Sequence, residues 1–366
     1  MSTEPQARSM PSASPASSAS PPPPAFSAPS ARHRVLVVSP TFHGYWRSIE
    51  DALARRGHDV RTLRYDAYDT VAAKALLKAR VELPERLHLP GDRRAAERRR
   101  VTDRAIAALV EHRPDRVLVI KGDLLDERFW DALADTPRIL WLYDDLHRHD
   151  YTTAFLREVG PVISYSPSES AQLRDAEGVD ARFMPDAFDP HRVGPSAHRS
   201  GEIAFVGSGY ANRFTTLGEL AHRGLPVHAY GREFSRHLLD RLRTWSWSRP
   251  AITASRDVPL EQAHRVVGEA AAAVNIHGLQ TGHAMRTFEI PGMGGVELVD
   301  RDDVEMFYDV GTEVAVWHDL DELEDLARRA LADPRWAQGL RDAGRRRTLA
   351  EHTFDHRMET VDSLWD

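Results

Sequence analysis

The chain has 366 residues, of which 42% are hydrophobic and 28% charged, a balance typical of a globular protein with two domains of about 150 residues each. Its net charge of −7 argues against a nucleic-acid partner, and the absence of cysteine excludes disulfide bonds and thiolate metal sites. The apolar runs have the length of strands and fall well short of the roughly 20 residues that span a bilayer, so we expect a cytoplasmic protein without a transmembrane segment.

Residues 1–31 consist largely of Ser, Pro and Ala and include a run of four prolines. Such a segment buries too little apolar surface to offset the entropy of ordering. The prolines also interrupt the continuous apolar stretch that a secretion signal needs. We therefore predict a disordered leader, followed by an N-terminal domain at residues 32–190.

The N-terminal domain alternates between short apolar runs and helical stretches. A β-branched run at residues 35–39 is followed by a loop, a helix that ends at Gly57 and a second strand at residues 58–63. Further runs of this kind lie at residues 116–120, 139–142 and 162–165. The alternation predicts a parallel sheet whose functional loops follow the carboxyl ends of its strands.

A second series of such units starts after a loop-like stretch near residues 185–200. Its expected strands lie at residues 202–206, 227–230, 272–276 and 296–299. Its expected helices lie at residues 213–223, 260–269 and 284–293. We therefore predict an α/β fold of two Rossmann-like domains, with the C-terminal domain at residues 191–350 and a final helix at residues 351–366.

Several motifs of the second half resemble those of the spore-maturation CgeB-like glycosyltransferase family. They are Phe205-Val-Gly-Ser-Gly-Tyr-Ala-Asn-Arg213, Tyr230-Gly231, Val274-Asn-Ile276, Arg286-Thr-Phe-Glu-Ile-Pro-Gly-Met-Gly-Gly295 and Glu351-His-Thr-Phe-Asp-His-Arg357. The resemblance implies the GT-B architecture, in which the last helix commonly returns to the first domain. It also implies sugar transfer from a nucleotide-sugar to an unidentified small-molecule, peptide or glycan acceptor, with no cofactor besides that co-substrate.

Arg286 and Glu289 form the centre of the expected donor site. A nucleotide-sugar carries a diphosphate, which suits backbone N–H groups at a helix start and a fixed guanidinium. Gly282 and His283 precede the expected helix, and Arg286 lies in its first turn. Glu289 follows one turn later on the same face, where its carboxylate can accept from both ribose hydroxyls. The competing interpretation is an exposed helical ion pair.

Related enzymes often carry a Glu-x7-Glu pair. We equate Glu289 with the second, ribose-binding glutamate, because Glu297 falls in a strand after the glycines and not in the helix before them. The first glutamate then falls at Thr281, which cannot supply a carboxylate. The chain thus departs from the wider pattern at a position that assists catalysis.

Gly207, Ser208 and Gly209 follow an expected strand and precede a helix, as in a dinucleotide-binding loop. The third glycine of that motif is replaced by Asn212, and no acidic residue closes the next strand, which disfavours a dehydrogenase. We expect this loop to approach the donor diphosphate closely, with Arg213 at the helix start. Further donor-site candidates are Tyr230 and Gly231 beside the nucleobase, Asn275 and His283.

The candidates for a catalytic base come from the N-terminal domain. An inverting transfer needs a group that removes the proton of the acceptor hydroxyl. The candidates are His43, after the first strand, and Asp144 and Asp145, after the strand at residues 139–142. A retaining transfer needs no dedicated base, and a structural role stays open for each residue. We predict no metal, because Arg286 and its helix can stabilise the leaving diphosphate.

Two alternatives to transfer stay open. One is a nucleotide-sugar epimerase of the same architecture, which would form its product from the donor alone. The other is a catalytically silent protein that binds nucleotide-sugars or a partner protein and acts as a regulator.

Overall fold

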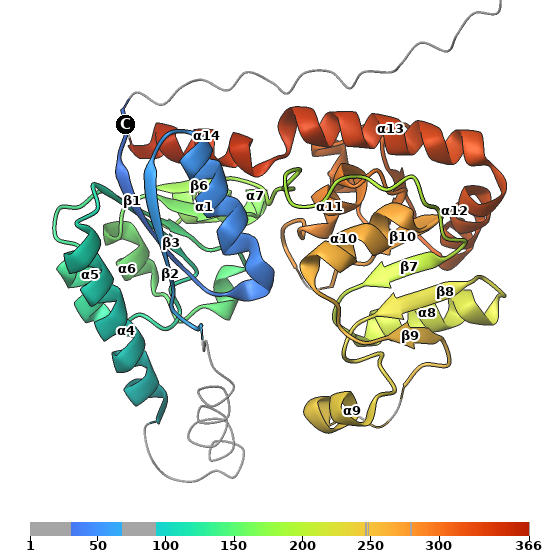
Figure 1. Cartoon of the computed structure of the whole chain (residues 1–366), viewed down its shortest axis with the longest axis horizontal. Coiled ribbons are helices and arrows are strands. Elements are labelled where there is room, and N and C mark those ends of the chain that lie inside the picture. Colours follow the sequence, from blue (N-terminus) through green and yellow to red (C-terminus); the bar gives the residue numbers. More distant parts are fainter. Residues whose placement is uncertain (1–30, 68–92, 246, 248, 279, 366) are drawn as a thin grey trace, which may run out of the picture.

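A computed structural model describes residues 31–67, 93–245, 247, 249–278 and 280–365. Residues 1–30 lie outside this part, and with them nearly all of the leader that is expected to be disordered. The described chain forms two α/β units, each built on its own six-stranded parallel sheet (Figure 1). This arrangement confirms the predicted fold class of two Rossmann-like domains.

The first sheet has the strand order β2-β1-β3-β4-β5-β6. Its strands are β1 (Arg34–Ser39), β2 (Asp59–Arg64), β3 (Arg116–Ile120), β4 (Arg138–Trp141), β5 (Val162–Ser164) and β6 (Ala181–Phe183). Its helices are α1 (Tyr45–Arg55), α4 (Arg93–His112), α5 (Glu127–Ala132), α6 (Thr153–Glu158) and α7 (Pro167–Asp175), with short 3-10 turns η1 (Phe42–Gly44) and η3 (Leu146–Arg148). Helices on both faces bury residues 35–38 completely, which explains the continuous apolar run of β1.

The second sheet has the strand order β12-β11-β10-β7-β8-β9. Its strands are β7 (Ile203–Val206), β8 (Val227–Tyr230), β9 (Thr253–Ser255), β10 (Ala272–Asn275), β11 (Glu297–Val299) and β12 (Ala315–Val316). The remaining elements are α8 (Ala211–His222), α9 (Leu238–Thr244), α10 (Leu260–Glu269), α11 (Arg286–Gly292), η4 (Asp302–Met306), α12 (Leu320–Ala332), α13 (Pro334–Glu351) and α14 (Phe354–Trp365). Within the described residues, no helix combines the length and the apolar character needed to cross a membrane.

Three strands were not predicted from the sequence, and all three are edge strands of two or three residues. These are β6, β9 and β12. So few residues cannot display an alternating or continuous apolar pattern over a useful length. Helix α9 was also missed, because its leucines do not face the core of the protein.

The end of the chain runs from the second sheet to the first. Helix α13 lies beside the second sheet (Figure 1). Helix α14 follows it in the chain and packs against α1 of the first unit. Met358 and Val361 of α14 are buried in the same core cluster as Ile49 and Leu53 of α1. The two units are therefore joined by the packing of α14 as well as by the chain between β6 and β7.

Candidate functional site

A cavity of about 210 Å³ lies between the two units. His43 and Tyr45 border it from the loop and helix after β1. Gly207, Gly231 and Arg286 are among the residues that border it from the second unit. Most of these residues follow the carboxyl ends of parallel strands, which is where ligands bind in open α/β sheets.

Two glycine loops form one wall of this cavity. A Cβ atom on Gly231 would lie 2.2 Å from the carbonyl oxygen of Gly207, so no larger residue fits at position 231 beside the loop after β7. A Cβ on Gly209 would lie 2.5 Å from the ring of Phe214. Gly207 and Ser208 border the cavity, whereas the N–H of Gly209 donates to Glu233, at 3.3 Å. The glycines thus allow the two loops to pack tightly, with the N–H groups of Gly207 and Gly231 bonded to Tyr230 and Ser255.

Arg286 brings a positive charge to the cavity. About a fifth of its side chain is exposed, and its Nε donates to the carbonyl oxygen of Val206 at 3.2 Å. Its Nη1 donates to Glu289. Burial lowers the pKa of Arg286 below its usual value of 12.5. The guanidinium is held at the end of β7, where it can face an anionic ligand.

Glu289 lies directly behind Arg286 and is only 1% exposed. Its Oε1 accepts from the hydroxyl of Tyr45 at 2.6 Å and lies 3.0 Å from Nε2 of His264, while Oε2 is paired with Arg286. The predicted placement of Arg286 and Glu289 on one helical face is thus present, but the pair is not an exposed one. In this arrangement the carboxylate binds a hydroxyl of the protein itself.

His264 is neutral in this cluster. Burial and then the charge of Arg286 lower the pKa of its imidazole to about 3. A neutral imidazole that faces a carboxylate through Nε2 carries its proton on that nitrogen, so His264 donates to Glu289. Burial likewise raises the pKa of Tyr45 to about 12, which keeps its hydroxyl protonated as a donor.

Helix α11 begins at Arg286, two residues later than predicted, and contains seven residues. His283 therefore precedes the helix, and its buried Nε2 lies 3.0 Å from Asp303 instead of bordering the cavity. Burial lowers the pKa of His283 to about 4. A helix this short contributes little dipole, so the charge of Arg286 is the main attraction for an anion.

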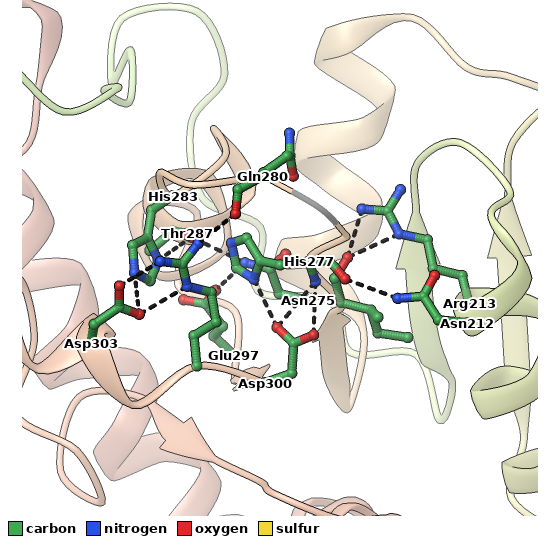
Figure 2. A network of polar contacts seen from close by, with 12 residues as sticks. Asn212, Arg213, Asn275, His277, Gln280, His283, Thr287, Glu297, Asp300 and Asp303 are labelled. Atoms are coloured by element: carbon green, nitrogen blue, oxygen red, sulfur yellow. Dashed lines mark hydrogen bonds and ion pairs between the residues drawn. The ribbon is translucent and has the colours of Figure 1, made fainter. Parts of the chain in front are cut away.

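Asn275 lies in a buried polar network below α11, shown in Figure 2. Its Nδ2 donates to Glu297 at 2.7 Å and to the hydroxyl of Thr287 at 3.1 Å. These bonds tie β10 to β11 and to α11. Burial raises the pKa of Glu297 well above its usual value of 4.5. Asn275 therefore supports the helix that carries Arg286 and does not itself reach the cavity.

Arg213 links the loop after β7 to the end of β10. Its Nε and Nη2 donate to the carbonyl oxygen of Ile276 at 2.9 and 2.6 Å (Figure 2). Its Nη1 donates to the carbonyl oxygen of Ser208 at 2.9 Å. Tyr230 stacks on the ring of His228, and its hydroxyl lies 3.3 Å from Glu202. Both side chains have the contacts of packing residues and neither borders the cavity.

Of the three candidates for a base, His43 alone borders the cavity. It is exposed and has a left-handed backbone with φ of 52°. Asp144 instead forms ion pairs with Lys121 at 3.2 Å and Arg148 at 3.3 Å. Asp145 is fully buried. These contacts leave His43 as the candidate with access to a ligand.

Asp145 has a contact that links the two units. One of its carboxylate oxygens accepts from the hydroxyl of Tyr165 at 3.0 Å and from the amide of Thr281 at 3.1 Å, and also binds the Thr281 hydroxyl. Thr281 is the position where the wider pattern has its first glutamate. The carboxylate of Asp145, from the N-terminal unit, thus lies beside position 281, where this sequence has a threonine in place of the glutamate.

Two residues that contact Glu289, His264 and Tyr45, were not predicted from the sequence. His264 lies on the buried face of α10 with Leu260, Ala263 and Val267, so its spacing could have marked it as a buried histidine. Tyr45 is 244 positions from Glu289, and no local signal connects the two.

A larger cavity of about 730 Å³ lies in the N-terminal unit, among α4, α5 and α6. None of the donor-site or catalytic candidates borders it, nor does any residue of the second unit. Volume alone therefore does not identify the functional site. The smaller cavity combines both units, two glycine loops and Arg286.

The part of the chain that carries Arg286 resembles a known protein family. Residues 213–363 match the model of a family described as glycosyl transferase-like. No curated protein matches the sequence.

Several solved structures share the fold over about nine-tenths of the chain. Sucrose-phosphate synthase of Thermosynechococcus elongatus aligns with a TM-score of 0.58 at 15% identity, over 90% of this chain and 98% of its own. HepE of Anabaena, solved with UDP-glucose, aligns with a TM-score of 0.57 at 10% identity, over 91% and 100%. A Listeria monocytogenes protein assigned as a UDP-N-acetylglucosamine 2-epimerase aligns with a TM-score of 0.53 at 13% identity, over 89% and 94%.

Identities this low establish the shared fold and not a shared substrate. The family match describes residues 213–363 as glycosyl transferase-like, and the solved structures establish the fold.

Proposed function

We propose that this protein transfers a sugar from a nucleotide-sugar bound in the cavity between the two units to an acceptor held by the N-terminal unit. The observation that carries the proposal is the position of Arg286, which borders this cavity beside two backbone loops and opposite His43. A guanidinium that is partly exposed at the cavity and fixed by Val206 and Glu289 suits a diphosphate.

In the proposed donor complex, Arg286 binds the diphosphate and the loop at Gly207 and Ser208 approaches it closely. Glu289 binds the ribose hydroxyls. The Tyr45 hydroxyl, 2.6 Å from Glu289, supports this role because it already shows the carboxylate accepting from a neutral hydroxyl. A ribose hydroxyl would take the place of the tyrosine.

The cavity is too small to hold a nucleotide-sugar as it stands, so we propose that the donor binds when the two units move apart. About 210 Å³ is less than the roughly 300–1,000 Å³ of typical small-molecule sites. A nucleotide-sugar therefore requires Tyr45 to withdraw from Glu289 and the two units to separate. Closure after binding would then exclude water from the reacting atoms.

For an inverting transfer, we propose His43 as the base. The acceptor oxygen would form a bond to the anomeric carbon of the sugar while its proton passes to the imidazole. The bond from that carbon to the diphosphate oxygen would break, and the nucleoside diphosphate would leave with its charge facing Arg286. The proposal includes neither a metal nor a further cofactor.

Membership of the CgeB-like family and a cytoplasmic location are also part of the proposal. The family assignment is supported by the sequence motifs between Phe205 and Arg357. The location is supported by the absence of cysteine from the chain.

An epimerase is the second candidate, because a protein assigned to that activity shares the fold. Incubation with the donor alone distinguishes the two: an epimerase forms a new nucleotide-sugar, whereas a transferase requires an acceptor. A silent binding protein would form no product and would not hydrolyse the donor.

The test of donor binding is a thermal-shift screen with UDP-, GDP- and dTDP-sugars, followed by calorimetry of Arg286→Ala and Arg286→Lys. Ligand binding to the folded state raises the melting temperature by mass action. Loss of charge-assisted hydrogen bonds should weaken the binding of the active donor by about tenfold or more in Arg286→Ala. The matched control is Arg265→Ala, at an exposed position of α10. Full affinity in Arg286→Ala, or no stabilisation by any nucleotide-sugar, would contradict the proposal.

A further inference from the structure

A cluster of exposed apolar side chains surrounds helix α9. Within the described residues, ten large hydrophobic side chains are exposed, and half of them lie between residues 238 and 247. They are Leu238, Leu239, Leu242, Trp245 and Trp247, with exposed fractions of 60, 56, 43, 69 and 57%, and we call them the α9 patch. Scattered exposed leucines need no explanation, but a cluster with two tryptophans marks an interaction surface.

The helix is anchored from its polar side. Asp240 is 2% exposed and forms ion pairs with Arg256, with contacts of 2.8 and 3.1 Å. The hydroxyl of Thr244 donates to the carbonyl oxygen of Asp240 at 2.9 Å. An ordinary surface helix turns its leucines to the core and its charges to water. Helix α9 instead buries the charged Asp240 and turns its leucines outward, while the element stays attached.

The position of α9 makes the patch accessible. The helix lies in the connection between β8 and β9, at the edge of the second sheet (Figure 1). It projects at the bottom of that view, on the side of the sheet far from α13 and α14. None of the five patch residues borders the donor cavity.

The segment that carries the α9 patch is also positively charged, in a chain whose net charge is −7. Four arginines lie between residues 236 and 249, and the acid of this segment is the buried, paired Asp240. Arg236 and Arg243 are exposed. Apolar and aromatic side chains beside arginines form the combination that enters the interface of an anionic membrane.

We propose that the α9 patch attaches this protein to an anionic lipid surface. The leucines and tryptophans enter the boundary between head groups and acyl chains, and the arginines contact the lipid phosphates. A standard protein–protein interface needs roughly 20–30 residues on each side. A projecting helix of seven residues offers far fewer, whereas a membrane accepts a small convex element. This inference stands independently of the proposed sugar transfer.

The test is flotation of the full-length protein with vesicles of phosphatidylcholine alone and of equimolar phosphatidylcholine and phosphatidylglycerol. The wild type should float with the anionic vesicles and not with the neutral ones, and added salt should weaken the binding. Trp245→Ser combined with Trp247→Ser should weaken it by about tenfold or more, because two large apolar side chains are lost. Arg243→Glu should weaken it by about fivefold or more.

The matched control is Met306→Ser combined with Val310→Ser, because these side chains are also exposed but lie outside the patch. All variants should keep the wild-type melting temperature, since the substituted side chains are exposed. Absence of wild-type flotation with the anionic vesicles would overturn the proposal, as would unchanged binding in the double Trp variant. A dimer in analytical ultracentrifugation that the Trp substitutions disperse, without vesicle binding, would assign the patch to a second copy of the chain and also overturn it.

Discussion

At the scale of single residues, the contacts of Glu289 determine how the proposed donor site would bind its ligand. Tyr45, His264 and Arg286 all contact its buried carboxylate. A hydrogen bond to a charged group contributes about 1.5–3 kcal/mol, so a ligand that replaces the tyrosine must first break a substantial interaction. In the proposed complex, the affinity for the donor therefore depends on Tyr45, a residue of the opposite unit.

The substitution Tyr45→Phe tests this competition. It removes the hydroxyl that occupies Glu289 and keeps the ring in place, so we expect donor affinity to increase by about tenfold, as measured by calorimetry. The control is Tyr143→Phe, because that hydroxyl contacts Met285 and not Glu289. Weaker binding in Tyr45→Phe would show that the hydroxyl contacts the donor and does not compete with it.

Glu297 provides a second prediction at this scale. Burial raises its pKa in the folded protein, so ionisation destabilises the fold and stability falls as the pH rises above the usual value of about 4.5. Glutamine resembles the neutral form and can still accept from Asn275. The melting temperature of Glu297→Gln, relative to that of the wild type, should therefore increase between about pH 5 and pH 8. A difference that does not change with pH would mean that Glu297 is not buried in its neutral form.

At the scale of elements, α14 holds the two units together through buried charge as well as apolar contact. Asp362 accepts from Nε of Arg56 and lies 2.9 Å from Nε2 of His58. The side chains of Arg56, His58 and Asp362 are all less than a tenth exposed. Such a cluster stabilises the packing only while every charge keeps its partner.

The substitution Asp362→Ala should destabilise the protein by about 3 kcal/mol, because it leaves the charge of Arg56 buried without its carboxylate. Urea unfolding measures this loss. The neighbouring exposed Ser363→Ala serves as the control and should change stability by less than about 0.5 kcal/mol. Equal stability of the two variants would show that the apolar contacts of α14 carry the whole interaction.

At the scale of the whole molecule, buried histidines make the fold sensitive to acid. Burial lowers the pKa of His264 and of His352 to about 3, and that of His283 to about 4. The unfolded chain binds these protons near pH 6.5, whereas the folded chain does not. The stability that they contribute is therefore complete above about pH 6.5 and is lost as the pH falls toward the folded pKa values.

Urea unfolding of the wild type should show this loss as a decrease in stability below about pH 6.5. Each histidine contributes about 1.4 kcal/mol per pH unit while it is protonated only in the unfolded chain. His352→Gln should reduce the slope by about that amount, since it removes one such group. An unchanged slope would mean that His352 is protonated equally in both states.

The fold class and the local part of the proposed donor site follow from the amino-acid pattern. Runs such as residues 35–38 must be buried on both faces, and their alternation with helices allows few arrangements other than parallel sheets. Arg286 and Glu289 lie one helical turn apart, so their contact follows from spacing alone. The short edge strands were missed because two or three residues display no period.

The surroundings of Arg286 and Glu289 depend on contacts between residues that lie far apart in the chain. Tyr45 and Glu289 are 244 positions apart, and Asp145 and Thr281 are 136 apart. Such contacts depend on how two separately patterned units pack, which no local period records. The same packing placed His43 at the cavity and directed Asp144 and Asp145 to structural partners, because access to a ligand is a property of the assembled surface and not of residue type.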